Sequence, residues 1–468
     1  MPVAHRLDIG GGAPRALATV TQGPRGTWST DGTILFKRNS NSPVWRVAAA
    51  GGEPVAVTRL DPPRQVEHRS PHFLPDGHHF LFEALGTPEA AGIYLGSLDG
   101  ATPTRLTAAD SAGAFLPPDW VTFVRQGTLV ARRLDLALGT LTGDPVTLAD
   151  RVGGFAVSGA GLIAYRAGGG ALRQLRWVDR TGKVVGVAGG PDANNLQAPE
   201  FSPDGRRVAI QRTAQNYADL WLLDLFRGGM TRLTFHAAQD ITPVWSPDGM
   251  RIAFGSDRLG VYDLYQKPSN GAGLEQTLLT SSIGKAPQDW SADGHWLLYY
   301  EINPTTGRDL WALDMTSPDR TPRVVANTAA EEVLAQFSPD GRWVAYQTNE
   351  SGRFELVVQP FPGAGGKWQV STSGGVAPRW RADGKELYFL APDATMMAVP
   401  VTAAGPSFEA GTPVALFPAR IVGGGSLAAN HPHYAVARDG RFLIHQPVAD
   451  AAVAPITLIL NWNPEAKK

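Results

Sequence analysis

The sequence contains no cysteine among its 468 residues. Disulfide bridges, thiol nucleophiles and thiolate zinc sites are therefore excluded. A chain without cysteine suits oxidising and reducing compartments equally, so this absence does not decide where the protein acts. An excess of charge of either sign is also lacking, because 42 lysine and arginine residues balance 43 aspartate and glutamate residues. A balanced total predicts neither nucleic acid nor an anionic membrane as a partner, since both attract a basic face.

Long apolar runs are absent as well. Nowhere do about eighteen consecutive apolar residues occur, so the sequence predicts no membrane span. Residues Met1–Arg6 lack the apolar segment of an export signal. If Met1 is the genuine start, we expect a cytoplasmic protein.

Catalytic motifs are also missing from the sequence. It has no Gly-x-Ser-x-Gly nucleophile turn, no Gly-x-x-x-x-Gly-Lys-Ser/Thr phosphate loop, and neither the His-Arg-Asp nor the Asp-Phe-Gly motif of protein kinases. We therefore expect no catalytic residue and no cofactor.

The sequence is rich in glycine and proline, and it repeats a five-residue phrase. The phrase is an aromatic residue followed by Ser-Pro-Asp-Gly. Its strict copies begin at Phe201, Trp245 and Phe337, and looser ones begin at Trp28, Phe73, Trp290, Trp380 and Tyr434. Proline presets φ, aspartate bonds its own backbone and glycine accepts a positive φ, so the phrase predicts a hairpin turn. An aromatic residue thus ends one strand before the next begins.

The aromatic residues recur about every 45 residues. The anchors are Trp28, Phe73, Phe115, Phe155, Phe201, Trp245, Trp290, Phe337, Trp380 and Tyr434. A period of this length with several short strands per unit is typical of a β-propeller, in which each repeat is one blade. We therefore predict an all-β protein of about ten four-stranded blades whose aromatic anchors are core residues.

Residues 243–254 and 337–346 resemble the WD40-like repeats of TolB-type propellers. Residues 338–352, 358–363, 396–401 and 460–462 are similar to the C-terminal propeller region of bacterial transmembrane serine/threonine kinases. The resemblance implies a periplasmic or other extracytoplasmic sensor module linked to kinase signalling or to the cell envelope. It brings no catalytic motif with it.

Rings of four to eight blades are usual, so ten blades favour two tandem propellers. The repeat sharpens after residue 195. We therefore expect an incomplete first propeller over residues 1–195 and a six-bladed TolB-like propeller over residues 196–468, with a single ten-bladed ring as the alternative.

Several polar groups have a structural interpretation. The aspartates of the turns are expected to cap them, and Asp219, Asp263 and Asp309 are expected to cap loops before third strands. The pairs His68 with His72 and His78 with His79 lack the geometry of a metal site, and the His431-Pro432-His433 segment lacks a third ligand. We therefore expect no metal.

One register suggests a binding site. The residue five positions before each anchor starts the innermost strand, where all blades converge on one mouth of the channel. Asp240, Lys285 and Glu332 occupy this register in successive units, and His431 lies close to it in the last. We predict that these four residues bind a ligand as exposed contacts.

The leading functional interpretation is a non-catalytic module that binds a protein, peptide or small ligand at the propeller mouth. The alternative is a lyase or hydrolase in the channel that uses His431, His433, Asp240 and Glu332. Stoichiometric metal in the purified protein would favour the enzyme.

Overall fold

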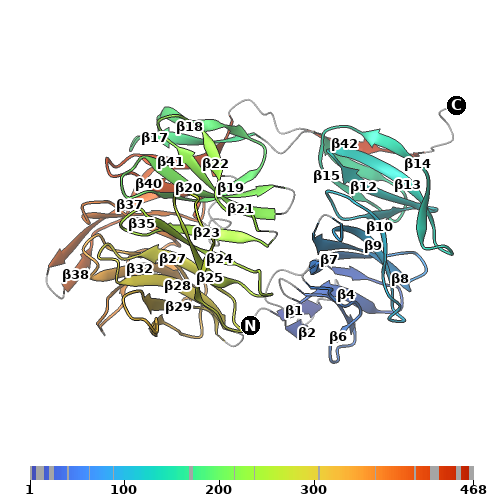
Figure 1. Ribbon diagram of the computed structural model, residues 1–468, viewed down its shortest axis with the longest axis horizontal. Coiled ribbons are helices and arrows are strands. Elements are labelled where there is room, and N and C mark those ends of the chain that lie inside the picture. Colours follow the sequence, from blue (N-terminus) through green and yellow to red (C-terminus); the bar gives the residue numbers. More distant parts are fainter. Residues whose placement is uncertain are drawn as a thin grey trace. The chain divides into compact units, whose positions relative to one another are not determined.

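The computed structural model describes fourteen segments of the chain, and every regular element in them is a β-strand. The described residues are 3–6, 15–19, 26–38, 42–62, 64–87, 89–167, 172–214, 217–236, 238–303, 306–363, 365–404, 407–421, 432–448 and 455–462. The prediction of an all-β propeller protein is confirmed. The chain divides into unit 1, residues 1–171 with 452–468, and unit 2, residues 172–451 (Figure 1).

Unit 1 contains a two-stranded sheet, three sheets of four strands and one of three. The first is β1 (Val3–Arg6) with β2 (Arg15–Thr19). The four-stranded sheets are β3 (Gly26–Trp28), β4 (Thr33–Lys37), β5 (Val44–Ala48) and β6 (Val55–Ala56); β7 (Gln65–Phe73), β8 (His79–Gly86), β9 (Gly92–Ser97) and β10 (Thr104–Thr107); and β11 (Ala114–Leu116), β12 (Trp120–Arg125), β13 (Thr128–Asp135) and β14 (Thr140–Ala149). The last combines β15 (Val152–Val157), β16 (Ile163–Ala167) and β42 (Ile456–Ile459).

Unit 2 contains six sheets. Five follow the chain: β19 (Asn195–Phe201), β20 (Arg207–Ala214), β21 (Tyr217–Asp224) and β22 (Met230–Arg232); β23 (Asp240–Trp245), β24 (Arg251–Ser256), β25 (Asp263–Pro268) and β26 (Gln276–Leu279); β27 (Lys285–Trp290), β28 (Trp296–Asn303), β29 (Gly307–Asp314) and β30 (Pro322–Ala326); β31 (Glu332–Phe337), β32 (Trp343–Thr348), β33 (Glu355–Pro360) and β34 (Trp368–Gln369); and β35 (Val376–Trp380), β36 (Glu386–Leu390), β37 (Thr395–Ala404), β38 (Ser407–Ala410) and β39 (Val414–Pro418).

The sixth sheet of unit 2 closes a ring by joining two distant parts of the chain. Its inner strands are β40 (Tyr434–Val436) and β41 (Phe442–Pro447), and its outer strands are β17 (Arg173–Val178) and β18 (Val184–Asp192). The innermost strands β19, β23, β27, β31, β35 and β40 contact one another in that order, and β40 contacts β19 again. Six sheets therefore form a closed ring, unlike the alternative of one ten-bladed ring.

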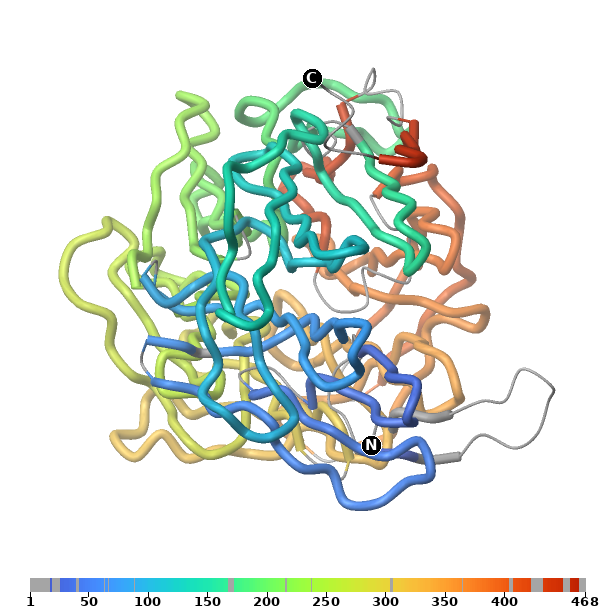
Figure 2. Tube along the Cα trace, turned by 90° about the vertical axis from the view of Figure 1, so that its right-hand side faces the viewer, coloured from blue at the N-terminus to red at the C-terminus, as the bar shows by residue number. Residues whose placement is uncertain are grey.

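The boundaries of the units differ from the expected division at residue 195. The ring takes β17 and β18 from the residues before that division, because they complete its closing sheet. Strand β42 lies outside the ring and pairs with β16 of unit 1 (Figure 1). The indole rings of Trp462 and Trp120 lie edge-on there, with their centres 5.1 Å apart. In the sequence, the ring is thus inserted between β16 and β42, two strands of one unit 1 sheet. In Figure 2 the trace of unit 1 is blue to teal apart from the red β42, and that of the ring runs from green to orange.

The repeated turns form as their chemistry predicts. Met250 donates its N–H to Asp248 Oδ1 at 2.9 Å, Ser246 bonds the same oxygen, and Gly249 has φ of +69°. The other turn aspartates accept a backbone N–H in the same way: Asp31, Asp76, Asp204, Asp293, Asp340, Asp383 and Asp439. Their role as turn caps is confirmed. Asp263 accepts the Ser281 N–H at 3.0 Å, so the loop that it caps follows the fourth strand β26 and does not precede the third strand as expected.

Most anchors are core residues, and the exceptions are Trp28, which is exposed, and Phe155 and Phe201, which are partly buried. Trp245, Trp290, Phe337 and Trp380 are 5–6% exposed. Trp28 is 53% exposed, in a sheet preceded in the sequence only by the two-stranded β1–β2 sheet.

The last anchor was placed two residues early. Val436 pairs with Phe442 as Trp245 pairs with Ile252, so Val436 and not Tyr434 ends this innermost strand.

Candidate functional site

The structure places Asp240, Lys285 and Glu332 in one register, as the first residues of β23, β27 and β31. Their expected exposure is wrong, because each is 0% exposed. His431 lies outside the described residues. Ligand binding by these residues stays a prediction, and each described one already has a partner within the ring.

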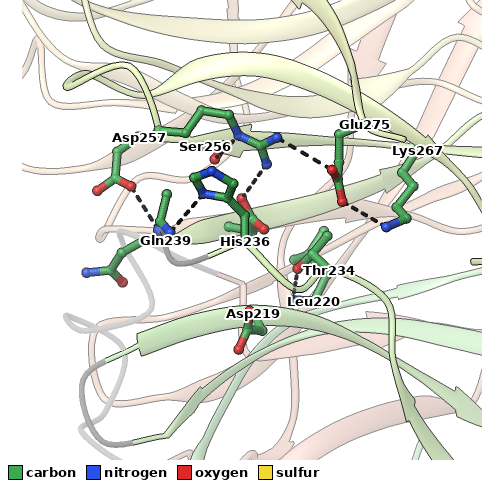
Figure 3. Close-up of polar contacts among 12 residues, drawn as sticks. Asp219, Leu220, Thr234, His236, Gln239, Ser256, Asp257, Lys267 and Glu275 are labelled. Carbon is green, nitrogen blue, oxygen red and sulfur yellow. Dashed lines mark hydrogen bonds and ion pairs between the residues drawn. The ribbon is translucent and has the colours of Figure 1, made fainter. Parts of the chain in front are cut away.

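Asp240 belongs to a charge network within one sheet, that of β23–β26 and its loops. Arg258 donates to Asp240 Oδ1 at 3.2 Å, and its guanidinium lies 3.7 Å from Glu275. Lys267 donates to the same Glu275 carboxylate at 2.8 Å (Figure 3). The Arg258 guanidinium also lies over the ring of Tyr265, 4.3 Å from its centre. Burial raises the pKa of Asp240, partly offset by hydrogen bonds and by Arg258.

Lys285 and Glu332 are likewise held internally. The Lys285 ammonium donates to Ser281 Oγ and the Ile283 carbonyl, both at 2.6 Å, and to Asp263 at 3.2 Å. The Glu332 carboxylate bonds the Thr328 hydroxyl, and burial raises its pKa. These groups stabilise the starts of the innermost strands.

The channel at the centre of the ring is lined by a different register. A cavity of about 20 Å³ lies there, enough for about one water molecule. Residues of all six innermost strands or their flanks line it: Ala198, Glu200, Thr242, Pro243, Val244, Pro287, Gln288, Leu334, Ala335, Arg379 and Pro432. Glu200 and Arg379 are the charged members, and each directly precedes an aromatic anchor.

A β-bulge explains why this register faces the channel. In β23, Ile241 pairs with Gly255 but Val244 pairs with Ala253, so β23 contains one extra residue. The same shift occurs in β19, β27, β31 and β35. An extra residue reverses the alternation of side chains, so the fifth and the first positions before the anchor face opposite sides.

Glutamines of neighbouring sheets hold several of these bulges. Thr242, Leu334 and Ala377 have φ between +49° and +56°. Their N–H groups donate to Gln211, Gln288 and Gln347, at 3.2, 2.7 and 2.9 Å. The channel wall is therefore fixed by bonds between sheets, which leaves the neighbouring side chains in defined positions.

Three ionisable groups from alternate sheets of the ring interact at the channel. Glu200 from β19 and Arg379 from β35 line the cavity, and their charges act on Asp289 from β27. The Arg379 guanidinium lies 3.7 Å from the Glu200 carboxylate, beyond the usual hydrogen-bond range of about 2.7–3.2 Å. Arg379 is 6% exposed, and its Nε has no hydrogen-bond partner among the described residues. Asp289 accepts the Phe337 N–H at 2.7 Å.

The environment shifts the pKa of both carboxyls upward. Burial raises the pKa of Asp289 to about 7, and the negative charge of Glu200 adds to the shift. Burial also raises the pKa of Glu200, against the opposing effect of Arg379. The Glu200 side chain nevertheless keeps 27% of its surface accessible. We interpret this surface as facing the channel cavity that Glu200 lines, with protein around it on the other sides.

Glu200, Asp289 and Arg379 differ from the predicted site residues, because the predicted register lies five positions before each anchor and theirs lies one position before it. A charged residue directly before a buried aromatic was the signal available, at Glu200, Asp289 and Arg379. Such a residue lies in an innermost strand, where an unpaired charge is costly.

The histidines do not form a metal centre in the part of the chain that the structure describes, where no group of three ligating residues occurs. His68 bonds Thr58 and Gln65, and burial lowers its pKa to about 4. His433 is 7% exposed, and burial lowers its pKa to about 4 as well.

Comparison with known proteins agrees with this geometry. Residues 180–308, within unit 2, match the family model described as the TolB beta propeller domain. This part of the chain is therefore similar to the repeats of TolB-type β-propellers. Among the described residues, no helix has the length and apolar character needed to cross a membrane.

Three relatives illustrate the likeness. The Tol-Pal system protein TolB of Wolinella succinogenes is 25% identical over 167 residues, 35% of this chain and 39% of that protein. The uncharacterized peptidase YuxL of Bacillus subtilis is 32% identical over 107 residues, 21% of this chain and 16% of that protein. This chain thus spans well under half of either relative. The crystal structure of TolB from Acinetobacter baumannii has 14% identity and a TM-score of 0.42, covering 64% of this chain and 81% of that one.

Proposed function

We propose that the ring of unit 2 is a non-catalytic binding module that holds part of a protein or peptide partner at its central channel. The observation that supports this is the set of poorly paired charges there. Glu200, Asp289 and Arg379 come from three sheets and do not satisfy one another. Buried charges without partners cost stability, and perturbed ionisable groups cluster at functional sites.

The size of the cavity favours a macromolecular partner over a small ligand. Small-molecule pockets usually enclose about 300–1,000 Å³, whereas a cavity of about 20 Å³ accepts a single small group. A partner would therefore cover the mouth with most of its surface and insert one group. The sequence alone predicts a protein, a peptide or a small ligand, and the size of the cavity favours the first two.

The alternative of a channel lyase or hydrolase has less support. It would use Asp240, Glu332 and His433, and all three are buried. A direct ligand contact by Asp240, Lys285 or Glu332 stays a prediction. Such a contact would have to displace the intramolecular partners Arg258, Asp263 and Thr328.

The wider setting follows from resemblance. One relative is named as part of the Tol-Pal system. We include in the proposal an extracytoplasmic location and a role in an envelope or kinase-linked signalling system.

The test compares the parent with a variant whose channel is neutral, carrying Glu200→Gln, Asp289→Asn and Arg379→Met. Removing poorly paired charges should leave its melting temperature equal or higher, while partners cross-linked to the parent in cells of the source organism should be lost. A matched control, Glu350→Gln with Lys367→Met, removes an exposed ion pair. A neutral variant that unfolds would make the three residues structural, and one that retains every partner would contradict the proposal.

A further inference from the structure

The channel site contains both unsatisfied acceptors and unsatisfied donors. The Glu200 carboxylate has only the distant Arg379 as a polar partner among the described residues. On the donor side, Arg379 Nη1 reaches the Pro378 carbonyl at 3.4 Å, and Nε has no partner in the described part of the chain. A complementary ligand therefore has to bring positive donors and a nearby acceptor oxygen.

The surroundings restrict the ligand further. The cavity wall is largely apolar, with Pro243, Pro287, Leu334 and Pro432, and the cavity has room for one small polar group. The end of a chain fits such a site better than its middle, because a chain segment would need a second way out. A free N-terminal residue combines an ammonium group with a carbonyl oxygen a few bonds away.

Resting on the proposed function, we infer that this site binds the free N-terminus of the partner. Its ammonium is the one small group that enters the cavity, beside Glu200 and near the Asp289 carboxyl, while its first carbonyl oxygen stays at the mouth on the side of Arg379. Capture of a chain terminus is a recurrent mode of peptide recognition. A lysine ammonium would leave Arg379 without an acceptor. A metal ion would meet two carboxylates and no third ligand among the described residues.

Binding should be linked to protons. The charges of Glu200 of β19 and Arg379 of β35 act on Asp289, and its Oδ2 accepts the Phe337 N–H of β31. β23 contributes uncharged Val244 to the cavity, and the charge of Arg379 also acts on buried Tyr434 of β40. An ammonium near the Glu200 and Asp289 carboxyls favours their charged forms. Below about pH 7, ligand has to displace the Asp289 proton, and above about pH 8 the ligand ammonium is itself lost. Affinity should peak between these values.

The experiment uses the full chain and two probes, the tripeptide amide Ala-Ala-Ala-NH₂ and its N-acetylated form, titrated by calorimetry at about pH 6, 7.5 and 9. The free peptide should bind with an optimum near the middle value and release protons at about pH 6. The acetylated peptide should bind at least about tenfold more weakly, because it lacks the charge. N-acetyl-lysine amide, whose only ammonium is on the side chain, tests the carbonyl requirement and should also bind weakly.

Single substitutions test whether Glu200 and Asp289 are responsible for peptide binding. Glu200→Gln and Asp289→Asn should each weaken the free peptide about tenfold and flatten the pH profile, whereas the control Glu350→Gln should change neither. Unchanged melting of each variant keeps a loss of binding from being a loss of fold.

Several outcomes would overturn the inference: equal binding of both tripeptides, binding of neither, lysine amide binding as well as the free peptide, or variants without effect. The proposed function has its own readout. If the neutral channel variant loses its cross-linked partners while the parent binds both tripeptides equally, that result would support the binding module and contradict the N-terminal ligand.

Discussion

Strand β27 carries two charged side chains, and they differ in how well the surrounding residues satisfy them. Lys285 at its start is 0% exposed and bonded to Asp263, Ser281 and the Ile283 carbonyl. Asp289, four residues later and beyond the bulge, accepts the Phe337 N–H, and the charges of Glu200 and Arg379 act on it with opposite sign. The first arrangement stabilises the fold, whereas the second is costly to it.

Replacing Lys285 by Met should lower the free energy of unfolding by about 3–5 kcal/mol, because it leaves the buried Asp263 carboxylate without its cation. Urea melts monitored by tryptophan fluorescence would measure the loss. The control is Lys385→Met at an exposed turn, with an expected change within about 0.5 kcal/mol. Equal effects would contradict the structural role of Lys285.

Asp289 should make stability depend on pH. Its folded-state pKa of about 7 lies above the unfolded value. The protonated Asp289 therefore makes its full contribution to the free energy of unfolding below about pH 4, and this contribution is lost as pH rises through about 7. Asp289→Asn should therefore be more stable than the parent by about 4 kcal/mol at about pH 8 and similar to it at about pH 4. Urea melts across this range provide the test, and parallel stability curves for the two proteins would refute the shift.

At the scale of the element, one turn and one anchor define each blade. Ser246 and Asp248 fix the turn, and Trp245 fills the space between neighbouring sheets with Ile252, Phe254 and Tyr265. The Trp245 indole also donates to the Glu200 carbonyl at 3.0 Å. An anchor in one sheet thus positions the backbone of a channel residue in the preceding one.

Trp245→Ala should cost about 3–5 kcal/mol of stability, as large aromatic truncations in packed cores do. Asp248→Asn should cost far less, because an asparagine oxygen can also accept the Met250 N–H. Denaturant melts of both variants would show whether anchor and turn differ in this way. Similar losses would mean that the indole does not carry the packing.

On the scale of the whole molecule, the ring is an insertion in the sequence, and the inserted residues supply every strand of its closing sheet. Its closing sheet joins β17 and β18 to β40 and β41, and the core beneath it brings Leu175 and Leu443 together with Val208. All these strands lie between residues 172 and 448. The ring therefore contains every strand that its closure needs, and β42 belongs to unit 1.

A fragment of residues 172–451 should accordingly fold alone and melt in one cooperative transition. A fragment of residues 196–468, cut where the sequence repeat sharpens, lacks β17 and β18 and leaves the edge of β41 and Leu443 uncovered. It should aggregate or melt without cooperativity. Calorimetry would compare the unfolding transitions of the two fragments. A 196–468 fragment that melts cooperatively would contradict the role of β17 and β18 in closing the ring.

The sequence by itself determined the all-β class, the hairpin turns and most of the core anchors. These features are local: proline, aspartate and glycine set a turn within five residues, and the aromatic residue before the turn ends a strand. The period of about 45 residues then determined that the strands form repeated sheets.

Only the tertiary structure decided which distant strands pair and which charged side chains are buried. β17 meets β41, and β42 meets β16, through hydrogen bonds that any extended segment can form, so local sequence does not select the partner. The bulge in the innermost strands reversed the side-chain alternation, which moved the channel from the register of Asp240 to that of Glu200. Burial of those groups depends on neighbouring sheets, and these are brought together only when the ring closes.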